Sequence, residues 1–355
     1  MKNYIRILVL LIAGASLLPV AGLEAAKSHN WRKGIPAYDE GRLVIRQDGP
    51  TLVFSDSPEM VRENGIMYQD IVIGEARLFF HHVNDTAAPK KIAVMLRNTE
   101  NVPAKIIFRN KGIAEPDYDY LRAGKEVQRQ FFGYYPNQVF YVPAGGSMEI
   151  LTGVGQITLK DQLVTGMLDF STDRRLEVSV LMTWPEKDVK EALTEERILP
   201  PDDGNVLRGT FPLADRIVDL KKSYKPDEGK IVGVLIADNV YDVYAAGIDA
   251  TTGKRVVNYG NYGIVYDIRY KIKGEQRIRI RLNPWGGWFA GAGRVSSNGE
   301  ERFVLFPQKE TAFGKTGSET IVIAEEDGFT EGRILFSPPG ASNLPIRLFF
   351  ETVEE

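Results

Sequence analysis

Histidines are the first residues to consider for chemistry, and this chain has only three, His29, His81 and His82. Histidine titrates near neutral pH and binds metals, so it is a frequent catalytic base and metal ligand. His81 and His82 are neighbours in a predicted strand, where adjacent side chains point to opposite faces of the sheet. We therefore expect structural roles for both. The chain has no Gly-x-Ser-x-Gly motif, which leaves little basis for a Ser–His–acid triad.

A tyrosine between acidic residues is a second candidate. Residues 117–120 (DYDY) are similar to the short tyrosine motif from which copper amine oxidases form their quinone cofactor. That motif has Asn where this chain has Asp117. The copper of those enzymes is held by three histidines, two of them in a His-x-His pair that this chain lacks. We expect a polar turn here, and we predict no catalytic residue, no metal ligand and no cofactor.

Paired carboxylates are the remaining route to catalysis. A glycoside hydrolase needs two Asp or Glu side chains about 5–10 Å apart, and the chain has 47 acidic residues. A carboxylate-based glycan hydrolase therefore stays open as an alternative function. The acidic stretches 202–205 (DDGN) and 238–242 (DNVYD) have oxygen atoms that suit calcium. Neither stretch fits the EF-hand loop, and we expect ordinary turns there.

Aromatic residues interleaved with glycine form the densest unusual feature of the chain. Two such stretches occur, at residues 258–263 (NYGNYG) and 283–289 (NPWGGWF). Glycine lets a loop present flat rings outward or approach a neighbour closely, and exposed rings beside Asn suit sugar or peptide binding. The alternative is a hairpin whose rings fill one end of a sandwich. We predict a ligand-binding site that contains the aromatic residues Tyr259, Tyr262, Trp285, Trp288 and Phe289.

Two arginines are the predicted source of positive charge at this site. In residues 276–282 (QRIRIRL), apolar residues alternate with arginines. This pattern predicts a strand with one buried face and one solvated cationic face. We include Arg279 and Arg281 in the ligand-binding site, where they would meet acidic groups of a polymer.

Short β-type segments separated by Gly, Asn and Asp turns carry these residues, which is the pattern of sandwiches and barrels. Two segments, 119–132 and 186–196, have helical character. In the first half we predict strands at 42–46, 51–54, 66–73, 76–83, 91–98, 104–109, 138–142, 147–151, 164–170 and 175–182. In the second half we predict strands at 206–211, 215–220, 230–237, 254–258, 263–272, 276–282, 301–306, 320–324, 332–336 and 345–352.

These elements predict an all-β protein with two consecutive antiparallel β-sandwich domains and one or two short helices. Residues 199–204 (LPPDDG) cannot continue regular structure, so we place the domain boundary there. The N-terminal domain is then residues 42–199 and the C-terminal domain residues 200–355.

The first 25 residues have the layout of a secretory signal peptide. Lys2 and Arg6 precede an apolar run at residues 7–20, which small residues follow. We expect cleavage after Gly22 or Ala25, a polar lead-in at residues 26–41, and no transmembrane segment in the mature protein, because the apolar run is short for a span.

Composition narrows the classes of partner. The 44 basic and 47 acidic residues give a net charge of -3, whereas nucleic-acid binding needs a basic face. The chain has no cysteine, so thiol nucleophiles, disulfides and Cys-based metal sites are absent. We expect no nucleic-acid partner.

Several stretches together resemble a group of uncharacterised secreted proteins of Gram-positive bacteria, which often carry a copper-amine-oxidase-like N-terminal domain. The resemblance spans most of residues 50–350 and implies an exported, envelope-associated role, with no known activity or site residues. It rests on residues 55–85, 208–216, 248–270, 279–295 and 336–349.

These observations favour an exported, non-catalytic binding or structural protein of the cell envelope. Its expected partner is a cell-wall polysaccharide or an envelope protein, and its expected location is extracellular or envelope-associated. Two alternatives stay open. One is the glycan hydrolase, and the other is a scaffold that contacts protein partners through an exposed apolar patch or an unpaired strand edge.

Overall fold

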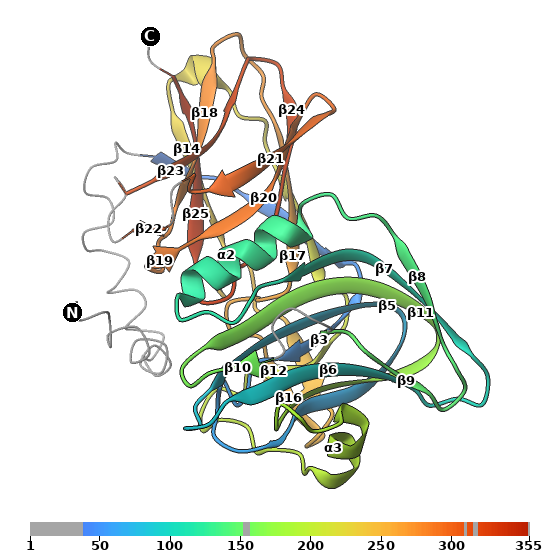
Figure 1. Ribbon diagram of the computed structural model, residues 1–355. Coiled ribbons are helices and arrows are strands. Elements are labelled where there is room, and N and C mark those ends of the chain that lie inside the picture. The colour runs from blue at the N-terminus through green and yellow to red at the C-terminus, as the bar shows by residue number, and fades with distance from the viewer. Residues whose placement is uncertain (1–37, 152–156, 309–310, 315–318, 354–355) are drawn as a thin grey trace.

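The computed structural model describes residues 38–151, 157–308, 311–314 and 319–353. It shows an upper and a lower β-rich part with one helix, α2, between them (Figure 1). The predicted signal peptide, residues 1–25, and most of the lead-in lie outside the described residues. Among the described helices, none has the length and apolar character needed to cross a membrane.

The lower part is a strongly bent sheet of twelve strands. Its central ladder joins β5 to β11, which run antiparallel along most of their length. The strands of this sheet are β3 (Thr51–Ser55), β4 (Met60–Val61), β5 (Gly65–Asn84), β6 (Lys90–Asn98), β7 (Ala104–Ile113), β8 (Gln138–Val142), β9 (Ser147–Glu149), β10 (Ile157–Thr158), β11 (Leu163–Thr183), β12 (Arg208–Phe211), β15 (Ala246–Asp249) and β16 (Lys254–Val257).

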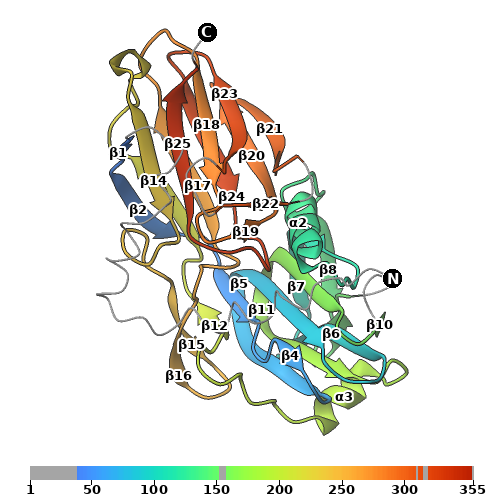
Figure 2. The ribbon, with the colours of Figure 1, turned by 90° about the vertical axis from the view of Figure 1, so that its left-hand side faces the viewer.

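The upper part contains two larger sheets and a short ladder (Figure 2). The five-stranded sheet has the order β1 (Tyr38–Glu40), β14 (Ile231–Ile236), β25 (Ile346–Thr352), β18 (Ile278–Asn283) and β23 (Ile321–Glu326). The six-stranded sheet has the order β2 (Leu43–Asp48), β13 (Asp215–Leu220), β17 (Val265–Lys271), β24 (Glu331–Phe336), β20 (Gly291–Ser297) and β21 (Glu300–Phe306). The short ladder pairs β19 (Trp288–Phe289) with β22 (Ala312–Phe313).

One hydrophobic core runs through both parts. Ile280 of β18 and Phe336 of β24 belong to the same buried cluster as Phe79 of β5 and Phe131 of α2. Neighbouring residues of β5 point the other way, so Leu78 and others fill a second core inside the bent sheet. This alternation is the period-2 pattern of a strand buried on both faces. The two parts are therefore joined by packing as well as by the chain.

Both predicted helices are confirmed, as α2 (Tyr120–Phe131) and α3 (Val189–Glu195). A short 3₁₀ turn follows at Pro226–Glu228. The Asp119 side chain caps α2 by accepting from the backbone N–H of Arg122. Gly124 weakens the helix intrinsically, but a Cβ there would lie 2.1 Å from the Gly340 carbonyl oxygen. Glycine is needed because α2 packs directly against the loop at residues 337–345.

The all-β fold class is confirmed, whereas the division of the strands differs from our expectation in three ways. Strands that we did not predict form, among them β15 at Ala246–Asp249 and β20 at Gly291–Ser297. The segments 66–73 and 76–83 form one strand, because Gly74 adopts a φ of +80° inside β5 and continues the ladder. The segments 164–170 and 175–182 likewise form one strand, β11, with a register shift between Thr172 and Leu176. The sheets also do not divide at residue 200. β1 and β2 precede residue 50 and pair in the upper sheets, whereas β12, β15 and β16 follow residue 200 and extend the lower sheet.

Candidate functional site

The tyrosine loop at residues 258–263 is held by two asparagine side chains. Asn258 donates from Nδ2 to the Tyr262 carbonyl at 2.8 Å and accepts from the Tyr262 N–H at 3.0 Å. The Asn261 Oδ1 accepts from the Ala245 N–H at 2.8 Å. The loop therefore holds Tyr259 rigidly at the surface, with 39% of the residue exposed and its ring edge-on to Tyr244 at 5.9 Å.

The tryptophan loop presents one of its rings and buries another. Trp288 is 38% exposed and its ring packs on Phe313 at a centroid distance of 4.6 Å. Trp285 is half-buried, with its ring 5.7 Å from the Arg347 guanidinium. Phe289 is fully buried in the main core. Including Phe289 among the ligand-binding residues was wrong, because it follows Trp288 on β19 and points to the opposite face.

The two aromatic loops converge on one connecting loop, residues 337–345. The Tyr262 hydroxyl donates to the Ser342 carbonyl at 2.7 Å. The next residue, Asn343, accepts from the Trp288 N–H at 2.9 Å and donates its own N–H to the Trp288 carbonyl at 2.7 Å. The tyrosine loop and the tryptophan loop, which are separate in the sequence, are thus hydrogen-bonded to two adjacent residues, Ser342 and Asn343. We define the aromatic cluster as Tyr244, Tyr259, Tyr262, Trp288 and Phe313.

The two arginines of the predicted site are already paired with carboxylates. Arg279 donates from Nε to Glu325 at 2.9 Å, and Arg281 contacts Glu351 at 2.5 Å. Their strand, β18, is the predicted alternating strand, but glutamates on β23 and β25 neutralise its charged face. The prediction that Arg279 and Arg281 present free positive charge was therefore wrong.

Three acidic side chains that sequence reasoning did not bring together lie near the aromatic cluster. Asp56 is 8% exposed, and its Oδ1 has no hydrogen-bond partner among the described residues. Glu59 is half-buried and Asp202 is exposed. Asp202 Oδ2 accepts from the Glu59 N–H at 2.8 Å and from the Ser57 hydroxyl at 3.2 Å. We call Asp56, Glu59 and Asp202 the acidic cluster.

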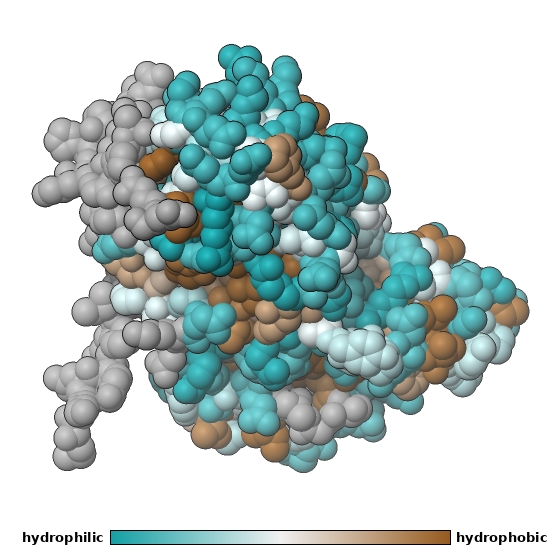
Figure 3. All heavy atoms as spheres, turned by 90° about the horizontal axis from the view of Figure 1, so that it is seen from above, coloured by the Kyte–Doolittle hydropathy of each residue, from teal (hydrophilic) through white to brown (hydrophobic). Residues whose placement is uncertain are grey.

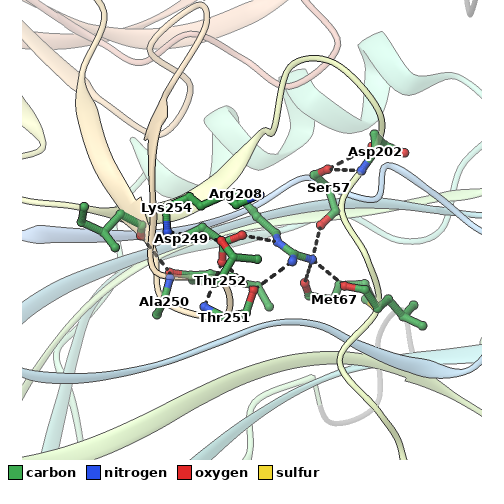
Figure 4. A network of polar contacts seen from close by, with 12 residues as sticks. Ser57, Met67, Asp202, Arg208, Asp249, Ala250, Thr251, Thr252 and Lys254 are labelled. Carbon is green, nitrogen blue, oxygen red and sulfur yellow. Dashed lines mark hydrogen bonds and ion pairs between the residues drawn. The ribbon is translucent and has the colours of Figure 1, made fainter.

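A buried arginine holds the backbone that carries this cluster (Figure 4). Arg208 is 1% exposed and donates from Nη1 to the carbonyl oxygens of Ser57 and Met67, at 3.3 and 2.9 Å. Its Nε contacts the equally buried Asp249 at 3.1 Å. The Arg208 guanidinium tolerates burial because its charge is paired with Asp249 and its other N–H groups donate hydrogen bonds. Its bond to the Ser57 carbonyl holds the backbone of the 55–59 loop in place.

The acidic cluster has unusual proton affinities. Burial raises the pKa of the Glu59 carboxyl to about 7, and the charge of Asp202 adds to this. Burial also raises the pKa of Asp56 well above its usual range, as do the charges of Glu59 and Asp202. The pKa of the buried Tyr262 hydroxyl is raised by desolvation and by the charge of Asp56. Perturbed carboxyl groups of this kind gather at functional sites.

His82 sits beside the acidic cluster in a geometry that superficially suits catalysis. Its Nδ1 lies 2.8 Å from the Pro58 carbonyl and its Nε2 lies 2.8 Å from the Ser55 hydroxyl. The carbonyl can only accept, so Nδ1 carries the proton and Nε2 accepts from Ser55. Burial lowers the pKa of His82 to about 4. Ser55 and His82 are both 0% exposed, so the pair serves to fix the loop.

The remaining sequence candidates have structural roles. His81 is the neighbour of His82 on β5 and points to the opposite face of the sheet. Its ring contacts the Thr165 hydroxyl at 3.1 Å. In the 117–120 turn, Asp117 pairs with Arg122 at 2.6 Å. The Asp238 carboxylate accepts backbone N–H groups of its own turn. Within the described residues, no group of three or more His, Asp or Glu could hold a metal ion.

Two further surface features bear on the alternatives. A cavity of about 550 Å³ beside α2 is lined by charges of both signs, including Lys111, Arg122 and Glu126. The edge strand β8 pairs only with β7 in the described sheet and exposes 68% of Tyr141. An unpaired apolar edge is the feature that the protein-scaffold alternative predicts. The face seen from above is mainly hydrophilic, with apolar residues in smaller patches (Figure 3).

Comparisons with known proteins leave the family open. No protein-family model matches this chain, and no curated protein matches it. Among solved structures, the chain is 10% identical to the CUB1-EGF-CUB2 domains of rat MASP-1, over 89% of this chain and 99% of that one, at a TM-score of 0.18. It is also 10% identical to an oxalate decarboxylase of Lactobacillus farciminis, over 90% and 88%, at a TM-score of 0.15. Such low scores carry no argument about fold or function.

Proposed function

We propose that this protein is an exported, non-catalytic protein of the cell envelope that binds polysaccharide through its aromatic cluster. The signal-peptide layout of residues 1–25 supports export. A sugar ring has apolar C–H faces and polar hydroxyl edges, so its binding sites combine aromatic rings with hydrogen-bonding groups.

One observation carries this proposal, the joint anchoring of the two aromatic loops on Ser342 and Asn343. Because both loops are tied to adjacent residues, Tyr259 and Trp288 are held in fixed relation with more than a third of each residue exposed. Rings that are fixed before binding lose little conformational freedom when a ligand arrives. The acidic cluster near Tyr262 adds hydrogen-bond acceptors for sugar hydroxyls.

The acidic cluster also favours a second candidate, glycan hydrolysis. A carboxyl group with a pKa near 7 is matched to general acid catalysis at neutral pH, and Glu59 is such a group. Glu59 would give its proton to the glycosidic oxygen as the bond breaks, and water activated by the exposed Asp202 carboxylate would add to the sugar carbon. Release of reducing ends from peptidoglycan by wild type, abolished by Glu59→Gln, would favour this candidate over pure binding.

The test of the proposed function is binding to purified Gram-positive wall polysaccharide and to peptidoglycan. The variant Tyr259→Ala/Trp288→Ala removes both exposed rings, and we expect it to bind about 5- to 150-fold more weakly than wild type, since one ring contact is worth roughly 0.5–1.5 kcal/mol. Tyr134→Ala is the matched control, because Tyr134 is 91% exposed and lies outside the aromatic cluster.

Saturable binding by wild type and by Tyr134→Ala, with loss in the folded double variant, supports the proposed function. Equal binding by all three proteins contradicts the role of the aromatic cluster. No binding by wild type to either polymer removes the polysaccharide proposal and favours a protein partner.

A further inference from the structure

A shallow hollow of about 500 Å³ is lined by residues of α3 and of the segments next to it. In both ribbon views α3 lies at the far end of the lower sheet from β19 and β22 (Figures 1 and 2). The lining of the hollow includes Asn64, Lys90, Trp184, Glu196 and Arg197. None of these residues belongs to the aromatic or the acidic cluster. The volume falls within the range of roughly 300–1,000 Å³ that small-molecule sites occupy.

A single exposed ring dominates this hollow. Trp184 follows β11 and is 46% exposed. The Lys90 ammonium lies 3.2 Å from the ring centroid, over one face of the indole. Lys90 is itself only 4% exposed and donates to the Asn64 Oδ1 at 2.7 Å. The cation–π contact and this hydrogen bond fix the ring from behind, which leaves its other face as the exposed part.

Two polar groups beside the ring are available to a ligand, one as a hydrogen-bond donor and one as an acceptor. The Asn64 side-chain amide has a free N–H₂ group, because only its oxygen is used by Lys90 in the described structure. The Glu196 carboxylate has no hydrogen-bond partner among the described residues, although its charge helps to keep Lys90 protonated by raising the pKa that burial lowers. The hollow thus offers donors and acceptors next to an apolar plane.

Charge decides the class of ligand. Arg197 pairs with Glu63 at 2.7 Å, and Glu195 pairs with Lys187 at 3.0 Å, so these charges are already balanced. The Glu196 carboxylate would repel an anionic ligand, and the Lys90 ammonium in the same lining would repel a cationic one. A neutral ring rich in hydroxyl groups avoids both penalties. Its C–H face fits the open side of Trp184, and its hydroxyls can both accept from Asn64 and donate to Glu196.

We propose that the Trp184 hollow is a second saccharide-binding site, which takes a neutral sugar unit of a polysaccharide chain. The choice of polymer rests on the proposed function, but the site itself is separate from the aromatic cluster. Two sites at distant ends of a molecule would let the protein hold one long chain twice or join two chains. Such double attachment strengthens binding to a polymer without strengthening binding to a short fragment.

Calorimetric titration with a soluble tetrasaccharide of N-acetylglucosamine, the neutral sugar of peptidoglycan strands, tests this site. We expect two binding events per wild-type chain, and in Trp184→Ala we expect one of them to be weakened about two- to tenfold. Trp184→Phe keeps an aromatic face and is expected to restore most of that event. Thermal melting of each variant confirms folding, and Tyr134→Ala again serves as the control for loss of an exposed ring.

The outcomes separate the two proposals. Loss of one event in Trp184→Ala and of the other in Trp288→Ala supports both sites. If Trp184→Ala binds like wild type while Trp288→Ala loses binding, the second site is wrong and the proposed function stands. If only Trp184→Ala loses binding, the hollow is a saccharide site and the aromatic cluster is not. Absence of any binding by wild type overturns both.

Discussion

Replacing Glu59 with glutamine should make the protein more stable at high pH than wild type. In the folded protein, burial and the charge of Asp202 raise the pKa of Glu59 from 4.5 to about 7. Because the folded value is above the unfolded one, the stabilisation from this group is fully present below pH 4.5. It is lost as the pH rises towards 7, where the folded protein must ionise a poorly solvated carboxyl.

The size of this effect follows from the shift. The rise from 4.5 to about 7 corresponds to roughly 3 kcal/mol, at about 1.4 kcal/mol for each pH unit. Glu59 is partly exposed, so solvent screening reduces the expected value to about 2 kcal/mol. Glutamine keeps the shape of the side chain but never ionises. The free energy of unfolding of Glu59→Gln, relative to wild type, should therefore increase by about 2 kcal/mol between pH 4.5 and pH 8.

Urea unfolding at a series of pH values measures this difference. Glu300→Gln is the matched control, because Glu300 is an exposed glutamate on β21, away from the acidic cluster. This control measures how the loss of a surface carboxylate changes the pH dependence of the free energy of unfolding. A Glu59→Gln variant whose stability parallels wild type at every pH would refute the account of the acidic cluster.

Three further predictions concern buried groups. Arg208→Met should lower the free energy of unfolding by about 3–5 kcal/mol in urea titrations, because it strands the buried Asp249 carboxylate. Arg77→Met should cost a similar amount, since Arg77 is 2% exposed and pairs with two aspartates from different parts of the fold. Phe289→Ala should cost about 3–5 kcal/mol by leaving a cavity, whereas Trp288→Ala, at the surface, should lower the melting temperature much less.

Local sequence patterns predict much of the secondary structure. The helix at residues 119–132 is found at Tyr120–Phe131, because Leu121, Val127 and Phe131 share its buried face and Asp119 caps it. The strand at 276–282 is found as β18, with Ile278 and Ile280 buried as the alternation requires. These features depend on residues close in sequence, which is why periodicity and capping chemistry reveal them.

Such local patterns do not predict which strands pair with one another. β2 lies at residues 43–48 but pairs with β13, and Arg77 of the lower sheet reaches Asp215 of the upper one. Nothing in the residues before position 50 indicates a partner near residue 217, because strand pairing is decided by packing across the whole core. The boundary expected near residue 200 therefore marks a turn-rich segment and does not separate the sheets.

Part of the candidate site could be predicted from the sequence. The glycine–aromatic loops indicated Tyr259 and Trp288, and the structure keeps both partly exposed. The acidic cluster was not predicted, because Glu59 and Asp202 are far apart in the chain and each looks like a turn residue. The acidic, turn-rich composition of residues 55–59 and 200–204 was the only signal, and many surface turns share it.

Hydrogen exchange of the protein alone and with Gram-positive wall polysaccharide tests the central claim most directly. The account predicts slower exchange of backbone amides in residues 257–263, 286–290 and 340–344, because these segments carry Tyr259, Tyr262 and Trp288 and the residues of the connecting loop that hold them. Saturating polysaccharide binding without protection in these segments, or with protection confined to other surfaces, would contradict the claim that the aromatic cluster is the binding site.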